Sequence, residues 1–209
     1  MYLIDKEQNN ISKLKQKTFA ELRFRERDHL QEWIAKNPSS LGEELLIIQK
    51  EFSGFSETNE RLDLLALDKF GNLVIIENKL DDSGKDVTWQ AIKYASYCSS
   101  LSKQDILKIY QDFLGSSAVA QEKISEFFDN KDISETLLNQ GQNSQRLILV
   151  AANFRKEVTS SVLWLMNFKI RIQCFKVTPF SFDDKLLLNV EQILPTKDTE
   201  DFSISIATK

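Results

Sequence analysis

The clearest pattern along the chain is a pair of short apolar runs joined by a turn. The runs are Leu62-Asp-Leu-Leu-Ala-Leu67 and Leu73-Val-Ile-Ile76, and the link between them is Asp68-Lys-Phe-Gly-Asn72. Apolar runs of this length, bounded by turn residues, are typical of buried strands. The link has Gly beside Asn, which favours a tight hairpin whose central residues adopt positive φ. The pattern therefore predicts two buried strands that pair antiparallel.

The rest of the chain alternates between helical and strand-like patterns. Apolar residues at helical spacing predict a first helix over 19–34, and Asp86 is expected near the N-cap of a longer one. The further helices are expected over 86–101, 104–114, 119–129 and 157–168, the further strands over 45–52, 147–152 and 170–177, and a last hairpin around 181–184. A crossover through a helix joins neighbouring strands of a mixed sheet. We therefore expect an α/β fold, a mixed β-sheet flanked by helices, with a helical insertion at about 103–130.

Three charged side chains lie on or just beyond the two apolar strands. Asp63 and Glu77 stand at similar distances before and after the turn, so an antiparallel hairpin brings them level. Glu77 and Lys79 are two residues apart and share one face of the strand, while Asn78 points the other way. Two carboxylates at such a place repel, and one takes up a proton unless a cation keeps both ionised.

The residue types indicate which cation that is. Asp and Glu offer oxygen ligands, and with no Cys or His nearby they favour a hard ion, Mg²⁺ or Mn²⁺. Such an ion helps to deprotonate a water and stabilises the charge that develops on a phosphate. We therefore expect Asp63 and Glu77 to bind the metal for phosphodiester hydrolysis, with Lys79 orienting the water or neutralising the phosphate.

The order of these residues resembles the PD-(D/E)xK nuclease superfamily. The motifs that carry the resemblance are Asp63, Glu77-Asn-Lys79 and Gln90-x-x-x-Tyr94, the last as in the RecB-type (QxxxY) branch. The segments 61–68 and 71–77, and the lead-in 30–42, look like the catalytic domain of NucS-type endonucleases. The similarity runs over residues 20–195, and Leu62, where the superfamily name has proline, removes no ligand.

The resemblance implies a restriction-endonuclease-like core and further site residues. It implies that Gln90 hydrogen-bonds near the metal and that Tyr94 supports Lys79 or a phosphate. It also implies an acidic residue on the first helix, for which we prefer Glu26, four residues from both Leu22 and Leu30, with Glu44 as second choice. The alternative for Gln90 and Tyr94 is an ordinary place on an amphipathic helix, and Glu-x-Lys on a strand is often a surface ion pair.

Composition limits the remaining classes. With 209 residues, of which 42% are hydrophobic, the chain can bury one core, and we expect a leader over 1–18, one nuclease-like domain over 19–195 and a tail or linker over 196–209. No run approaches a membrane span and the N-terminus lacks a signal-peptide pattern, which favours a cytoplasmic protein.

Cys98 and Cys174 are expected to be buried free thiols. A single histidine, His29, excludes His-based zinc hydrolysis and argues against a Ser-His-Asp mechanism.

Charge leaves the partner and the activity partly open. The net charge of −4 argues against a tight duplex binder, but basic residues gather in the N-terminal segment and around the expected site. They are Lys13, Lys15, Lys17, Arg23, Arg25 and Arg27, then Lys79, Lys85 and Lys93. We expect a Mg²⁺- or Mn²⁺-dependent endonuclease of repair or restriction that acts on DNA rather than RNA. The alternative is a module that binds nucleic acid or protein without cleavage, and the resemblance also leaves a homodimer open.

Overall fold

The computed structural model describes residues 1–55, 60–115, 117–141 and 144–196. In chain order its elements are β1 (Tyr2–Asp5), β2 (Asn10–Lys13), β3 (Lys15–Gln16), η1 (Glu26–Gln31), α1 (Glu32–Lys36), η2 (Pro38–Leu41), β4 (Leu45–Phe52), β5 (Leu62–Asp68), β6 (Leu73–Asp82), α2 (Val87–Cys98), α3 (Lys103–Leu114), α4 (Ser117–Phe127), β7 (Gln145–Asn153), α5 (Lys156–Asn167), β8 (Ile172–Phe182) and β9 (Lys185–Leu194). Among the described residues, no helix combines the length and apolarity needed to cross a membrane.

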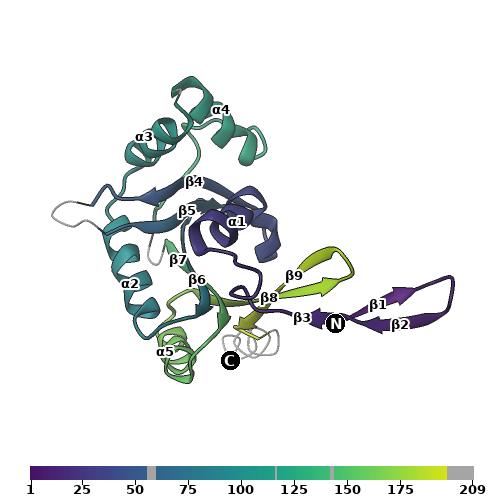
Figure 1. Ribbon diagram of the computed structural model, residues 1–209. Coiled ribbons are helices and arrows are strands. Elements are labelled where there is room, and N and C mark those ends of the chain that lie inside the picture. Colours follow the sequence, from purple (N-terminus) through teal and green to yellow (C-terminus); the bar gives the residue numbers. More distant parts are fainter. Residues whose placement is uncertain (56–59, 116, 142–143, 197–209) are drawn as a thin grey trace, which may run out of the picture.

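One mixed sheet organises the molecule (Figure 1). Its strands lie in the order β3-β8-β7-β6-β5-β4, and β9 also pairs with β8. β5 is antiparallel to both of its neighbours, β4 and β6, whereas β6, β7 and β8 run parallel, with α5 as the crossover between β7 and β8. This confirms the predicted hairpin, the predicted crossover and the mixed α/β class.

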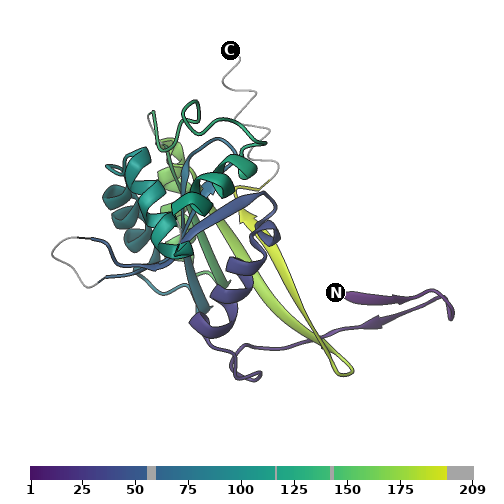
Figure 2. The ribbon, with the colours of Figure 1, turned by 90° about the horizontal axis from the view of Figure 1, so that it is seen from above.

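Helices cover both faces of the sheet and create two apolar cores (Figure 2). On one face α2, α3, α4 and α5 pack against residues such as Leu65, Leu67 and Ile75. On the other, η1 and α1 pack against residues such as Leu64 and Ile76. Because every residue of β5 is buried, the strand carries an almost unbroken apolar run, as central strands do. The helices α3 and α4 form the predicted insertion.

The first helix starts later than predicted. The periodicity predicts a helix over 19–34, but the helical residues begin at Glu26, as the π-helical turn η1, and continue in α1 to Lys36. Thr18 and Glu21 exchange side chain–backbone hydrogen bonds of 2.8 and 3.1 Å, a capping box that starts one turn, and Arg23, with φ +55°, ends that turn before Glu26. Phe19 is buried nonetheless, so its place in the pattern reported core contact and not helical geometry.

The hairpin turn between β5 and β6 depends on Asp68 and Gly71. The carboxylate of Asp68 accepts hydrogen bonds from the backbone N–H groups of Phe70 and Asn72, both at 2.9 Å. Gly71 has φ +80°, and a Cβ built on it would stand 2.0 Å from the carbonyl oxygen of Leu137. Of the two residues predicted at positive φ, Gly71 adopts it and Asn72 does not.

A single asparagine after the helical insertion ties three segments together. The side-chain amide of Asn139 donates to the carbonyls of Cys98, at 3.1 Å, and Leu101, at 2.8 Å, at the end of α2. Its backbone N–H donates to the carbonyl of Gly71 at 2.7 Å. The two ends of the insertion are therefore held beside the hairpin turn.

The termini differ from the body of the molecule. The predicted leader contains the β1–β2 hairpin and β3, which pairs with the far end of β8. α2 begins after Asp86, which occupies the N-cap position without a side-chain capping bond. Of the predicted tail over 196–209, residues 197–209 lie outside the described part of the chain. Cys98 and Cys174 are buried free thiols, as expected.

The close approach at Gly71 yields a stability prediction. Gly71→Ala should lower the free energy of unfolding by about 2–4 kcal/mol, because the left-handed backbone costs about 1–2 kcal/mol and the clash with Leu137 adds to it. The matched control is Gly42→Ala, since Gly42 has φ +79° but open space where a Cβ would stand. Urea titrations of both variants measure the difference. Equal losses would show that the Leu137 contact adds nothing.

Candidate active site

The hairpin brings Asp63 and Glu77 side by side. β5 and β6 pair Leu64 with Ile76 and Leu65 with Ile75, and the same register continued by one step places Asp63 opposite Glu77. By strand alternation Glu77 and Lys79 share the face of Leu73 and Ile75, which α2 covers. Asp63 is 7% exposed and Glu77 is 0% exposed. Two carboxyl groups therefore meet beneath the surface at the end of the hairpin remote from its turn.

Asp63 accepts hydrogen bonds through both its carboxylate and its backbone carbonyl. Its Oδ2 accepts a 2.8 Å hydrogen bond from the backbone N–H of Asn78, and its carbonyl accepts one of 3.3 Å from the Gln31 side chain. Burial raises the pKa of Asp63 to about 6, and the negative charges of Glu26 and Glu51 add to the effect. The Asn78 N–H and the Lys79 ammonium oppose that rise without cancelling it.

Glu77 is the least satisfied carboxyl group of the site. Both of its oxygens are buried, and neither accepts a hydrogen bond of good geometry from any described residue. Burial, and then the charge of Asp63, raise the pKa of Glu77 to about 9, although Lys79 and the backbone amide of Asp63 pull it down. A buried carboxylate without partners is costly, so the group needs either a proton or a cation.

The donor set fits a divalent cation that keeps several waters. Asp63 and Glu77 supply hard oxygen ligands, and the unpartnered oxygens of Glu77 are free to coordinate. Across the part of the chain that the structure describes, no three His, Cys, Asp or Glu side chains form a ready metal cluster. One or two carboxylates with water and substrate oxygens are the usual protein ligands of Mg²⁺.

Lys79 and Glu26 close the side of the site that faces solvent. The Lys79 Nζ lies 3.7 Å from Oε1 of Glu26, and Oε2 of Glu26 accepts a 2.9 Å hydrogen bond from the backbone N–H of Leu80. The side chains of Lys79 and Glu26 are 27% and 33% exposed. The second choice, Glu44, is wrong: it is exposed and pairs with Lys69 beside the hairpin turn, at the other end of the strands.

Gln90 and Tyr94 lie one turn apart on α2 and act on the start of β5. The Gln90 side-chain amide donates to the Tyr94 hydroxyl at 3.3 Å, and that hydroxyl donates to the carbonyl of Arg61 at 2.8 Å. Burial, with a contribution from the charge of Glu77, raises the pKa of Tyr94. The hydroxyl therefore anchors the residue two positions before Asp63, whereas the resemblance implied support for Lys79 or a phosphate.

Sequence reasoning missed Glu51 and Gln31. Glu51 lies on β4 between residues paired with Leu62 and Leu64, so it is the neighbour of Asp63 on the side opposite Glu77. The Gln31 amide donates to Oε1 of Glu51 at 3.0 Å as well as to the Asp63 carbonyl. A bulge precedes Glu51, whose own φ is +52°. The available signal was a polar Gln-Lys-Glu segment inside the otherwise apolar strand 45–52.

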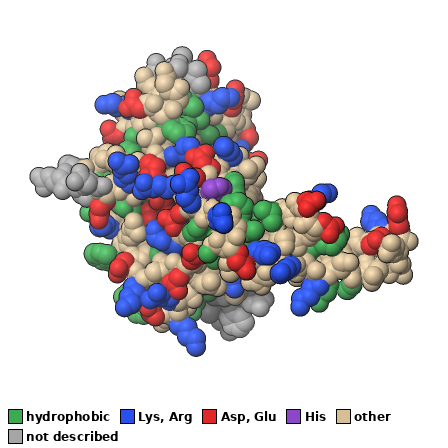
Figure 3. Space-filling model, viewed as in Figure 1, with side chains coloured by type: hydrophobic (Ala, Val, Ile, Leu, Met, Phe, Trp, Pro, Cys, Tyr) green, Lys and Arg blue, Asp and Glu red, His purple; other side chains and the backbone are tan. Residues whose placement is uncertain are grey.

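Basic residues surround the site, but their charge is largely matched. Lys and Arg side chains gather over the middle of the face shown in Figure 3, interleaved with acidic ones. Arg27 lies 3.1 Å from Glu51, Lys50 lies 2.5 Å from Glu32, and Lys93 pairs with Glu60. Lys13 and Lys15, by contrast, belong to β2 and β3. The rim of the site is a band of ion pairs and not an unopposed basic patch.

Comparisons with known proteins find only distant structural similarity. No family model matches the chain, and no curated protein matches it. Two similar solved structures are an EndoMS–dsDNA2 complex and a repair endonuclease from Pyrococcus abyssi, each with 15% sequence identity and a TM-score of 0.41. They cover 72% and 73% of this chain, which covers 44% and 48% of theirs. The chain thus spans less than half the length of each.

Proposed function

We propose that this chain is a metal-dependent nuclease that hydrolyses phosphodiester bonds in DNA. The observation that carries the proposal is the buried pair Asp63 and Glu77, with two unpartnered oxygens on Glu77. A purely structural role is a poor explanation, because an apolar pair of the same size would fill the place without the cost of burial. The motif order Asp, Glu-x-Lys and Gln-x-x-x-Tyr supports the PD-(D/E)xK superfamily and its QxxxY branch, and DNA is the substrate that we propose.

The residues divide the work as follows. Asp63 and Glu77 would hold Mg²⁺ or Mn²⁺, which supplies Lewis acidity and a more acidic water when bound. Lys79 places its ammonium at the open side of the site, where it neutralises a phosphate oxygen or orients water. Glu26 limits the swing of Lys79 and fixes the strand through the Leu80 N–H. Gln90 and Tyr94 position β5 through the Arg61 carbonyl.

A second candidate is a module on a nuclease scaffold that binds nucleic acid or protein without cutting. The complete burial of Glu77 and the ion pairing of the surrounding basic residues favour it. The two candidates differ in a direct way. Binding that is equal in EDTA and Mg²⁺, with no cleavage of single-stranded, duplex, mismatched or flap DNA, would support the module and reject the nuclease.

The first prediction from the proposed function concerns Lys79. Lys79→Ala should reduce Mg²⁺-dependent cleavage by about 100-fold or more, the usual loss when a group that stabilises developing charge is removed. Among the described residues the Lys79 side chain, which is 27% exposed, makes one long ion pair, so the circular dichroism spectrum and melting temperature should stay close to wild type. Lys108→Ala, on the exposed side of α3, is the matched control. Undiminished cleavage by Lys79→Ala would reject the assignment.

The second prediction separates metal binding from catalysis. With Mn²⁺ at about 100 times its Kd, the wild-type protein should gain about 2.7 kcal/mol of stability, without any nucleic acid present. Glu77→Gln should lose both this gain and cleavage, because an amide is a far weaker ligand for a hard cation. Denaturant titrations with and without Mn²⁺ give the readout. Equal stabilisation of the two proteins would show that the metal binds elsewhere.

The third prediction is a pH dependence of the metal-free protein in EDTA. The folded pKa of Glu77, about 9, lies above its ordinary 4.5, so the folded state holds a proton that the unfolded state has released. Stability should therefore fall as pH rises, by up to about 1.4 kcal/mol per unit towards pH 9. Asp63 adds to the fall only below about pH 6. The stability of Glu77→Gln should stay constant between pH 6 and 9. An equal decline in that variant would show that the pH dependence does not come from Glu77.

A further inference from the structure

The N-terminal hairpin projects from the molecule with its apolar side chains uncovered. Figures 1 and 2 both show β1 and β2 standing away from the body as an arm. Ile4 and Ile11 face each other across the hairpin and are 71% and 58% exposed, and Tyr2 and Leu3 are exposed too. A lone two-stranded hairpin is marginally stable in water. The β1–β2 hairpin, residues 2–13, is here called the arm. Its exposed apolar side chains therefore need a surface on which to pack.

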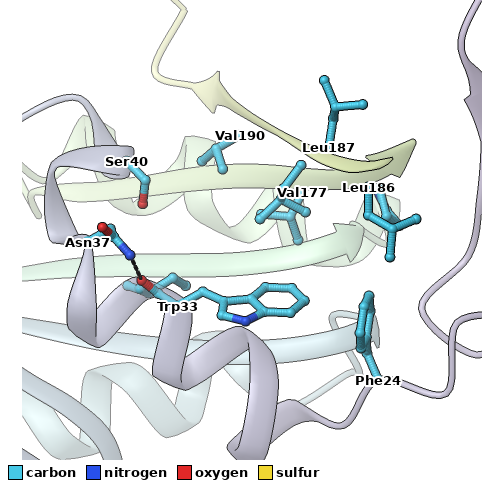
Figure 4. A pocket seen from close by; sticks show the side chains of 11 residues that line it. Phe24, Trp33, Asn37, Ser40, Val177, Leu186, Leu187 and Val190 are labelled. Carbon is cyan, nitrogen blue, oxygen red and sulfur yellow. Dashed lines mark hydrogen bonds between the residues drawn. The ribbon is translucent and has the colours of Figure 1, made fainter. Parts of the chain in front are cut away.

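An apolar groove lies between α1 and the β8–β9 hairpin (Figure 4). Phe24 and Trp33, in edge-to-face contact at 4.9 Å, form one wall. Leu186, Leu187 and Val190 of β9 contribute to the other, and the cavity volume is about 340 Å³. The groove is thus apolar on both sides and large enough to receive side chains from outside.

The groove and the root of the arm share one corner of the molecule. β3, which leads out of the arm, pairs Lys15 with Ser181 and Gln16 with Phe180, a few residues before Leu186 in the same hairpin. From there the arm runs outward past the tip of the β8–β9 hairpin instead of turning back over the groove (Figure 2). The chain therefore places its uncovered apolar segment next to its own groove without filling it.

β9 adds an open strand edge at the same corner. It pairs with β8 on one side, and no described strand pairs with its other side. Its first three residues, Lys185-Leu-Leu187, are exposed. Proteins normally shorten, charge or cover such an apolar edge, because it otherwise recruits another strand.

We propose that a second copy of this chain covers this corner, each arm packing into the groove and along the β9 edge of the other. The three features are complementary and adjacent, so a two-fold axis beside the β8–β9 tip brings each arm to the partner's groove. Such an isologous contact uses the same patch twice and closes after two copies. The active-site carboxylates take no part in it, so the dimer and the nuclease stand or fall separately.

The mass of the protein in solution tests the proposal. At tens of micromolar in EDTA, light scattering should give twice the 24.1 kDa of one chain. The double variant Ile4→Asp/Ile11→Asp and the single variant Leu187→Asp should each give one chain's mass with an unchanged circular dichroism spectrum. Phe70→Asp, an apolar-to-acidic change at an exposed turn far from this corner, should remain a dimer. Wild-type protein with the mass of one chain overturns the proposal.

A cross-link shows which chain the arm occupies. Ile4→Cys/Leu187→Cys should form a disulfide between copies on mild oxidation, seen as a two-chain band without reductant, since the native Cys98 and Cys174 are buried. Mixing the two single-cysteine variants should give the same band. A cross-link confined to one chain would mean that the arm folds onto its own groove, and no band would mean that the arm lies elsewhere. Either result overturns the proposal.

Discussion

The site depends on the burial of two carboxyl groups next to each other on one hairpin. A carboxylate is normally stabilised by hydration, and here β5, β6 and α2 exclude water from Glu77. The surrounding residues compensate only in part: Asn78 donates to Asp63, and Lys79 supplies the nearest positive charge. The fold therefore leaves the negative charge of the two carboxylates partly uncompensated. A proton or a divalent cation can compensate it, and which of the two binds affects both the ionisation of the pair and the stability of the fold.

The strands of the fold follow from the sequence because burial on both faces leaves a strong local signature. The hairpin, the parallel crossover and the helical insertion all correspond to apolar runs and turn residues that are visible without the structure. The first helix shows the limit of that method. Phe19 keeps the apolar periodicity, yet the positive φ of Arg23 ends the turn that Thr18 and Glu21 cap, so residues 19–25 stay outside the helix. A backbone break of this kind leaves no mark in the spacing of apolar residues.

The site residues that the strand register brings together could be predicted from the sequence. Those that only tertiary contacts bring together could not. Asp63 and Glu77 meet because the hairpin register places them opposite each other, which strand counting reproduces. Glu51 and Gln31 come from β4 and η1, and no spacing rule connects them to Asp63. Tyr94 shows a related limit: its position on α2 was evident, but its partner, the Arg61 carbonyl, depends on how α2 sits against β5.

The contacts of Asn139 separate the length of the helical insertion from the geometry of the site. One side chain and one backbone N–H fasten the exit of the insertion to the end of α2 and to the Gly71 carbonyl. These anchors fix the points at which the chain leaves α2 and returns towards β7, on either side of α3 and α4. Because α3 and α4 also cover one apolar face of the sheet, this excursion cannot be trimmed without uncovering that face, and a domain grafted into it has to leave both helices in place.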